Sequence, residues 1–258
     1  MVPAASLYDH PYYYEIAFSY RDIEEEVDVI EQLIKKYSKT PVHTVLEIGC
    51  GPAPHMPELA KRGYHYVGID INEKMLQYAR QKAEKLGIKA ALIKADMRSF
   101  TLKHPADFAF VLLGSLYAKT TQDILSHLNS MAKALKPGAL YLLDWCIHFQ
   151  WDKGLSDTQE WTIQRDNVKV DVTYTEEPLN RAAQTYRRKI LATVNHNEKT
   201  LHLQSTEEVR AIFPQEFLLL LEKTGKFELI GWWNNWNLNQ PIEKATQIAR
   251  PITVIRRI

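Results

Sequence analysis

The 258-residue sequence lacks the features of a disulfide-rich, metal-binding or membrane-spanning chain. It has two cysteines, Cys50 and Cys146, which form neither a disulfide framework nor a metal-ligand spacing. No apolar run reaches the roughly 18 residues that a membrane span requires. The first ten residues lack the charged and apolar regions of a signal peptide. We therefore expect a cytoplasmic protein without a membrane partner or a metal site.

The sequence also lacks an excess of one charge. Lysine and arginine total 32, and aspartate and glutamate total 31. A chain this close to neutrality has no basic field to attract a phosphate backbone, so we expect no nucleic-acid partner. Hydrophobic residues make up 45% of the sequence, and a chain of this length can bury a large core without disulfides or metals.

Short apolar segments alternate with amphipathic helical segments in the first half of the sequence. The first helical segment carries apolar residues at helical spacing from Ile23 to Tyr37. Predicted strands then follow at residues 42–48, 64–69, 88–93, 107–113 and 139–143. Strands that alternate with helices form parallel sheets through right-handed crossovers. We predict an α/β fold with a Rossmann-like, doubly wound sheet of seven strands, the last of them antiparallel.

The pattern changes after about residue 160. Residues 160–176, 184–195 and 200–212 alternate polar and apolar side chains, which is typical of long antiparallel strands. A helix at 214–223 and strands at 227–233 and 252–256 return to the first pattern. We predict an N-terminal lid segment and helix at 1–40, a core at 41–148 and 214–258, and an antiparallel β insertion, acting as a substrate cap, at 149–213.

A glycine-containing turn, Gly49-Cys50-Gly51, follows the first predicted strand. Glycines let the backbone bend tightly and approach a ligand at the carboxyl ends of parallel strands. Asp70 ends the second strand, 21 positions after Gly49, where a carboxylate can accept both hydroxyls of a ribose. Asp96-Met97 follows the third strand, where a carboxylate can accept a hydrogen bond from adenine. The alternatives are that Asp70 only caps a helix and that Asp96 is an ordinary loop residue.

The residues around this turn do not suit a dinucleotide. Pro52, Pro54 and Pro57 remove backbone N–H donors from the place where a diphosphate would bind. Glu47 adds a negative charge that suits a cationic methionine group better. The main rival among enzymes is an NAD-dependent oxidoreductase. The prolines and Glu47 at this turn argue against it.

Four segments in order resemble the motifs of class I S-adenosylmethionine-dependent methyltransferases of the small-molecule type. They are residues 45–51, 67–70, 94–97 and 134–138. Ala53 departs from the common third glycine of the first motif. The resemblance implies S-adenosylmethionine as cofactor and S-adenosylhomocysteine as product. It places Glu47, Gly49 and Gly51 at the methionine end, Asp70 at the ribose, Asp96 and Met97 at the adenine, and Leu113 and Gly114 on the other flank. Cys50 and Ile71 are further predicted cofactor contacts.

Three regions are candidates for the acceptor site, where methyl transfer needs in-line approach and exclusion of water. In the N-terminal aromatic segment we predict that Tyr14, Tyr20 and Arg21 contact the cofactor or the substrate. The alternative is that these residues attach the segment to the core. Tyr117 and His148 follow the fourth and fifth strands and are the predicted catalytic residues. His148 is the candidate base because imidazole titrates near neutral pH, and the alternative is a structural histidine. Residues 232–236, with three tryptophans and two asparagines, suit an acceptor pocket, the edge of the insertion or a dimer interface.

The sequence therefore predicts a methyltransferase that moves a methyl group from S-adenosylmethionine to a nitrogen or oxygen of a small molecule by in-line displacement. The protein would be a monomer or a homodimer. Two alternatives stay open at this point: a methyltransferase that acts on a protein, and a catalytically silent relative that binds the nucleoside.

Overall fold

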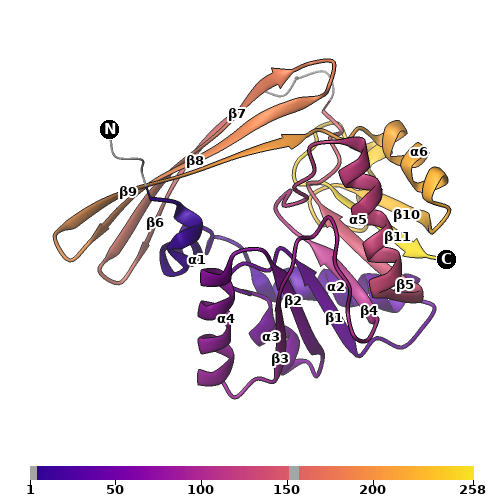
Figure 1. Cartoon of the computed structure of the whole chain (residues 1–258), viewed down its shortest axis with the longest axis horizontal. Helices are drawn as coiled ribbons and strands as arrows, with labels where there is room; N and C mark the ends of the chain where they lie inside the picture. Colours follow the sequence, from indigo (N-terminus) through magenta and orange to yellow (C-terminus); the bar gives the residue numbers. More distant parts are fainter. Residues whose placement is uncertain (1–4, 151–156) are drawn as a thin grey trace.

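The computed structural model describes residues 5–150 and 157–258. Residues 1–4, which belong to the opening segment and the predicted lid, lie outside the described residues, as do residues 151–156 of the predicted insertion. The described chain forms one sheet of seven strands and one of four strands (Figure 1). Among the described residues, no helix is long and apolar enough to cross a membrane.

The seven-stranded sheet has the order β10-β11-β5-β4-β1-β2-β3. Its strands are β1 (Thr44–Ile48), β2 (His65–Asp70), β3 (Ala90–Lys94), β4 (Ala106–Val111), β5 (Leu135–Asp144), β10 (Phe227–Trp233) and β11 (Ile252–Arg257). Strands β1 to β5 are paired in parallel, and β11 is antiparallel to both β5 and β10. All six residues of β4 are buried, as expected of a central strand covered on both faces. The predicted Rossmann-like α/β fold is confirmed.

Helices cover both faces of this sheet. They are α2 (Ile23–Tyr37), α3 (Met56–Lys61), α4 (Glu73–Lys85), α5 (Thr121–Ala134) and α6 (Pro214–Thr224). One apolar cluster joins the sheet to α2, α3 and α4, and a second joins it to α5 and α6. Asn72 caps α4 by accepting hydrogen bonds from the backbone of residues 74 and 75, and Thr120 and Asp123 form a capping box on α5.

The smaller sheet lies within the predicted insertion and is called the platform here. It consists of β6 (Asp157–Arg165), β7 (Val168–Asn180), β8 (Thr185–His196) and β9 (Lys199–Arg210), each antiparallel to its neighbour. Figure 1 shows it reaching outward beyond the larger sheet. The sequence predicted one strand over residues 160–176, but the structure has two strands there. Asp166 adopts a positive φ of 52° at the turn between them, a conformation that aspartate tolerates better than most residues.

Residues 178–180, Pro-Leu-Asn, have the composition of a turn and follow the predicted strand at 160–176. Pro178 lies inside β7, next to a register shift, and the chain turns at residues 181–184 instead. A bulge in the pairing accommodates a residue that has no N–H to donate. The four strands occupy the segment predicted as the insertion, whereas the division into domains stays a prediction.

The N-terminal segment lies between the platform and the core (Figure 1). It contains the 3-10 helix η1 (Leu7–Asp9) and the helix α1 (Pro11–Ala17). Trp161 of β6 donates its Nε1–H to the carbonyl of Ala17 at 2.7 Å, and Tyr78 of α4 donates to the carboxylate of Glu15 at 2.7 Å. The segment is therefore attached to the platform and to helix α4 of the core. A further 3-10 helix, η2 (Ile242–Lys244), precedes β11.

Candidate active site

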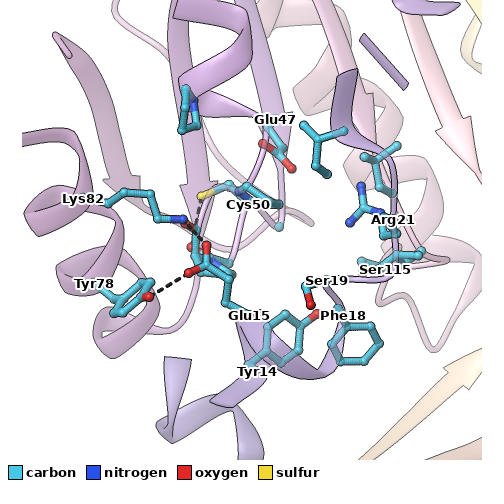
Figure 2. Close-up of a pocket in the computed structure, with 18 of the residues that line it drawn as sticks. Tyr14, Glu15, Phe18, Ser19, Arg21, Glu47, Cys50, Tyr78, Lys82 and Ser115 are labelled. Atoms are coloured by element: carbon cyan, nitrogen blue, oxygen red, sulfur yellow. Dashed lines mark hydrogen bonds and ion pairs between the residues drawn. The ribbon is translucent and has the colours of Figure 1, made fainter. Parts of the chain in front are cut away.

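Two adjoining cavities open at the carboxyl ends of β1, β2, β3 and β4. The larger has a volume of about 680 Å³ and the smaller about 440 Å³. Both are lined by Tyr14, Gly49, Gly51 and Ser115, and the region where these residues meet is called the junction here. Figure 2 shows Tyr14, Ser115 and the turn that contains Cys50 around the larger cavity.

The glycine turn forms the floor of the junction. Gly49 and Gly51 have positive φ angles of 63° and 51°. A Cβ on Gly49 would lie 3.3 Å from the terminal carbon of Met97, so a side chain there would be both strained and crowded. Between them, Cys50 is buried, and its N–H donates to the carbonyl of Ile69 at 2.9 Å. Burial raises the pKa of the Cys50 thiol, so the group stays protonated.

Asp70 connects two backbone turns beside the smaller cavity. Its Oδ2 accepts a hydrogen bond from the N–H of Gly51 at 2.8 Å, and its Oδ1 accepts one from the N–H of Asn72 at 2.7 Å. Each oxygen has a further lone pair for a ligand hydroxyl. Burial raises the pKa of this carboxyl, although the backbone donors oppose the shift. Because Asn72 caps α4, Asp70 is not needed for that role.

Asp96, Met97 and Ile71 line the same cavity. Asp96 accepts from the N–H of Arg98 at 2.9 Å and forms an ion pair with its guanidinium at 2.6 Å. That hydrogen-bonded guanidinium lowers the pKa of Asp96. The sulfur of Met97 accepts from the N–H of Tyr117 at 3.4 Å. A carboxylate and a thioether therefore lie at the end of the smaller cavity formed by residues 95–98.

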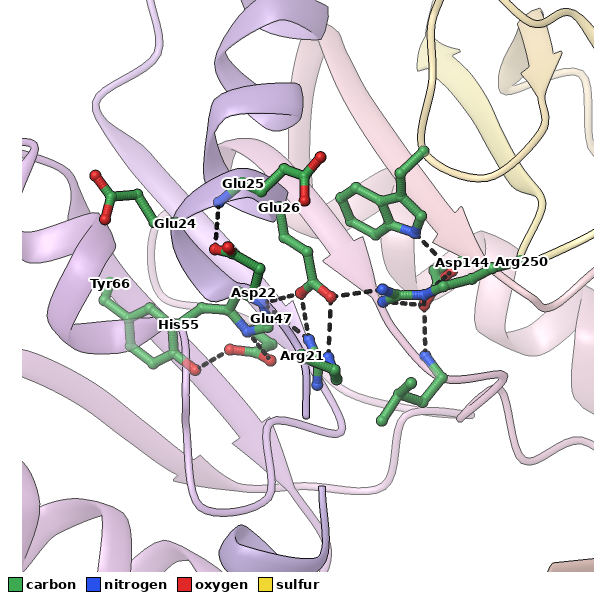
Figure 3. A network of polar contacts seen from close by, with 12 residues as sticks. Arg21, Asp22, Glu24, Glu25, Glu26, Glu47, His55, Tyr66, Asp144 and Arg250 are labelled. Carbon is green, nitrogen blue, oxygen red and sulfur yellow. Dashed lines mark hydrogen bonds and ion pairs between the residues drawn. The ribbon is translucent and has the colours of Figure 1, made fainter. Parts of the chain in front are cut away.

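Glu47 is buried at the carboxyl end of β1 and lines the larger cavity. One carboxylate oxygen lies 3.1 Å from Nδ1 of His55, and the other accepts from the hydroxyl of Tyr66. Figure 3 shows these contacts. Nε2 of the fully buried His55 lies 2.7 Å from the carboxylate of Glu26 on α2. Burial lowers the pKa of His55, but the two carboxylates outweigh it, and the net pKa is raised.

Arg21 and Arg250 complete this charged network (Figure 3). Both guanidinium groups bind Glu26, and Arg250 also forms an ion pair with Asp144 at 2.9 Å. Burial alone would raise the pKa of Glu26, but its donors lower it well below the usual range. Arg21 lines the larger cavity together with Glu47. A cation and an anion therefore lie at the same end of this cavity.

The structure brings most of the predicted cofactor residues together. The residues found in the lining of one or both cavities are Tyr14, Arg21, Glu47, Gly49, Cys50, Gly51, Asp70, Ile71, Asp96, Met97 and Leu113, together with Tyr117. The hydroxyl of Tyr117 lies 3.0 Å from that of Tyr8, which also lines the smaller cavity. Their roles in binding stay predictions.

Three predicted residues lie outside the described lining of both cavities. Tyr20 is exposed and packs against Trp161, and Gly114 donates to the carbonyl of Asp144 at 2.9 Å. His148 is half-buried, with Nε2 at 3.3 Å from the hydroxyl of Tyr186. Burial and the nearby charge of Arg188 lower the pKa of His148 to about 4. Its role as a base stays a prediction.

Residues 232–236 hold the C-terminal loop. The indole of Trp236 donates to Asp144 at 2.9 Å, and the side chain of Asn234 binds the backbone of Gln247 and Ala249. None of residues 232–236 belongs to the described lining of either cavity.

Sequence reasoning missed Arg188 and Glu207 of the platform. Arg188 is buried, and its Nη1 donates to the carbonyl of Gly114 at 2.9 Å. Glu207 lies opposite Arg188 in the register of β8 and β9, and it lines the smaller cavity. The sequence did contain a signal for the burial of Arg188. Arg188 stands in the same alternating series of β8 as Ile190 and Ala192, whose side chains face the interior.

Comparisons with known proteins agree with this geometry. Residues 45–138 match the family described as a methyltransferase domain. YqeM of Bacillus subtilis, which carries the name of a methyltransferase, is 31% identical over 102 residues, covering 39% of this chain and 41% of the relative. A ubiquinone biosynthesis O-methyltransferase of Aliivibrio fischeri is 30% identical over 94 residues, covering 36% of this chain and 40% of the relative. The chain thus spans less than half the length of these relatives.

The structural likeness covers nearly the whole chain. The structure of CalS10 with bound S-adenosylmethionine, an amino pentose methyltransferase from Micromonospora echinaspora, covers 95% of this chain and 96% of its own. The TM-score is 0.73 at 18% identity, which shows a common fold. The Gly49 turn and the two joined cavities fit an extended nucleoside such as S-adenosylmethionine. Residues 45–138 therefore resemble a methyltransferase domain, and the whole described chain has the fold of solved S-adenosylmethionine-dependent methyltransferases.

Proposed function

We propose that the two cavities hold the two halves of S-adenosylmethionine. The methionine half lies in the larger cavity, the adenosine half lies in the smaller one, and the sulfonium lies at the junction. The observation that carries this proposal is the sharing of Tyr14, Gly49, Gly51 and Ser115 by both cavities. Asp70 then accepts the ribose hydroxyls through the lone pairs that its backbone donors leave free.

The charges of the larger cavity match those of the methionine half. Arg21 binds its carboxylate, and the negative charge of Glu47 favours its ammonium group and the sulfonium. Both side chains are held by the network around Glu26 and His55, so they are positioned before the ligand binds.

We place the acceptor between the junction and the platform. Arg188 ties the platform to the Gly114 carbonyl, one residue before Ser115 at the junction. Tyr8, Tyr14 and Tyr117 give this region aromatic walls. Such walls with a few polar groups suit a small molecule, which agrees with the amino pentose named for CalS10.

An amine nitrogen is the acceptor atom that the geometry favours. Burial raises the pKa of Tyr14, so its hydroxyl stays protonated and orients a nucleophile without removing its proton. His148 lies outside the described cavity lining. A neutral amine needs no base, because its lone pair forms the N–C bond as the C–S bond breaks, and the product releases a proton to water. The bound cofactor supplies the electrophilic methyl group.

A hydroxyl acceptor is the second candidate. It is favoured by the sequence likeness to a ubiquinone biosynthesis O-methyltransferase and by the presence of Tyr117 in the cavity. It would require a base, for which His148 is neutral at physiological pH and therefore in the correct state.

The first experiment is calorimetric titration of S-adenosylmethionine and S-adenosylhomocysteine into the ligand-free protein. Micromolar binding supports the cofactor placement, whereas binding of NAD in their stead contradicts it. Turnover is then followed as S-adenosylhomocysteine formation with amino sugars, phenols and peptides. Methylation of amino sugars supports the proposal, methylation of phenols alone favours the second candidate, and methylation of peptides alone indicates a protein acceptor. If no acceptor is methylated, the remaining candidate is a catalytically silent relative that binds the nucleoside.

Tyr14→Phe separates acceptor positioning from cofactor binding. We expect turnover to fall roughly 10-fold, the effect of one lost hydrogen bond, while the affinity for S-adenosylhomocysteine is retained. Tyr12→Phe is the control, because Tyr12 is exposed and lies outside the described cavity lining. Unchanged turnover in Tyr14→Phe would remove Tyr14 from the acceptor site.

A further inference from the structure

Helix α5 holds the backbone that follows β3. Three of its side chains contact backbone groups of residues 97–100, the segment that closes one end of the smaller cavity. Ser126 donates to the carbonyl of Arg98 at 2.7 Å, Nδ1 of His127 lies 2.8 Å from the carbonyl of Met97, and Ser130 accepts from the N–H of Phe100 at 3.4 Å. His127 is the fully buried member of the three.

The partners of His127 fix its tautomer. The Met97 carbonyl can only accept a hydrogen bond, so Nδ1 of His127 carries the hydrogen. The remaining nitrogen, Nε2, lies 2.9 Å from the hydroxyl of Tyr141 on β5 and accepts its hydrogen. Burial lowers the pKa of His127 to about 4, so the ring is neutral at physiological pH. The direction of donation therefore runs from Tyr141 to His127 to Met97.

One peptide unit carries this orientation to Asp96. The Met97 carbonyl and the Arg98 N–H belong to the same planar group, so they cannot rotate independently. His127 holds the carbonyl, and the N–H donates to Oδ1 of Asp96 at 2.9 Å. Turning this peptide would release the Asp96 oxygen from its backbone donor.

We propose that His127 is a positioning residue for recognition of the adenine base. Through the peptide between Met97 and Arg98, it orients the Asp96 carboxylate to accept a hydrogen bond from the exocyclic amine of adenine. This inference rests on the proposed placement of adenosine in the smaller cavity. The backbone N–H and the guanidinium of Arg98 already donate to both oxygens of Asp96, so the adenine amine would take the place of one guanidinium donor of this exposed arginine.

The test compares the affinities of S-adenosylhomocysteine and S-inosylhomocysteine, in which a carbonyl oxygen replaces that amine. His127→Asn keeps an amide donor near the position of Nδ1, and His127→Gln keeps a polar group near the position of Nε2. Each variant retains one of the two hydrogen bonds of His127, which makes them matched controls. We expect the wild-type protein and His127→Asn to prefer the adenosine ligand about 10-fold or more, and His127→Gln to lose most of that preference.

Tyr141→Phe is the second variant and keeps the imidazole in place. Without the Tyr141 hydroxyl, Nε2 of His127 loses its donor and the ring is held only by its hydrogen bond to the Met97 carbonyl, so the preference for adenosine should fall to an intermediate value. If His127→Gln does not fold, this variant decides the question.

Three outcomes would count against the proposal. Equal preference in the two His127 variants overturns the positioning role, because a merely structural histidine would affect both ligands alike. An unchanged preference in Tyr141→Phe does the same for the contribution of the Tyr141 hydrogen bond. A wild-type protein that binds neither ligand contradicts the proposed function itself, which separates that failure from a failure of His127.

Discussion

Asp70 shows how one side chain can serve two backbone turns and still be available to a ligand. Its two oxygens accept from Gly51 and Asn72, which lie in the turns that follow β1 and β2. A ribose that binds here meets a carboxylate whose direction is already fixed, so little side-chain entropy is lost on binding.

Asp70→Asn should therefore weaken cofactor binding. The amide nitrogen would face either a backbone N–H or a ribose hydroxyl in place of an acceptor, and we expect a loss of roughly 1–3 kcal/mol in binding free energy. Calorimetry with S-adenosylhomocysteine measures it. The exposed Asp166→Asn is a control for charge, and an affinity equal to that of the wild type would show that the ribose lies elsewhere.

At the scale of elements, the platform is attached to the core through Arg188 of β8. Its guanidinium donates to Gly114 and to the hydroxyl of Tyr186, and it lies 3.5 Å from the carboxylate of Glu176 on β7. Gly114 admits this contact because a Cβ there would lie 3.1 Å from the guanidinium. The platform and the segment leading to Ser115 are therefore coupled by one buried cation.

Arg188→Met should uncouple them. Removing the cation leaves Glu176 partly buried without its ion-pair partner, and we expect the free energy of unfolding to fall by about 2–4 kcal/mol in urea titrations. The Michaelis constant for the acceptor should rise, because the platform no longer fixes the acceptor site.

Arg187→Met is the matched control for this change. Arg187 is the next residue of β8, and its exposed side chain points to the opposite face of the sheet. Equal stability of the Arg187 and Arg188 variants would show that Arg188 does not attach the platform to the core.

At the scale of the whole molecule, histidines with lowered pKa values set the response to acid. Burial holds the pKa values of His127 and His148 at about 4, below the usual 6.5. Between these values the unfolded chain binds protons that the folded chain does not, so stability falls as the pH is lowered. The buried His55 acts in the opposite sense, because its raised pKa adds stability that is lost as the pH rises through that value.

We expect the free energy of unfolding to decrease from pH 6.5 to pH 4 by up to roughly 3 kcal/mol for each of these two histidines. Urea unfolding at several pH values measures the slope. His148→Gln should reduce it, since one titrating group is removed, and His104→Gln, at an exposed site, should leave it unchanged. A slope that is the same in His148→Gln would show that His148 titrates normally in the folded protein.

Local sequence determined the elements and the order of the cofactor motifs. Apolar periodicity, the Asn72 cap and the Gly49 turn depend on neighbours a few residues apart, so the doubly wound sheet and many residues of the cavity lining could be predicted without a structure. The turn at Asp166 was missed because it interrupts an alternation that continues on both sides with the same period.

Only the tertiary structure decided which distant side chains meet. His148 follows β5 and meets Tyr186 of the platform, a contact between residues 38 positions apart in the sequence. Arg188 reaches Gly114 across 74 positions of sequence, and no local pattern encodes that distance. Hydrogen bonds of this kind depend on how the platform docks on the core, and the docking is the sum of many weak apolar contacts that are not written in any single segment.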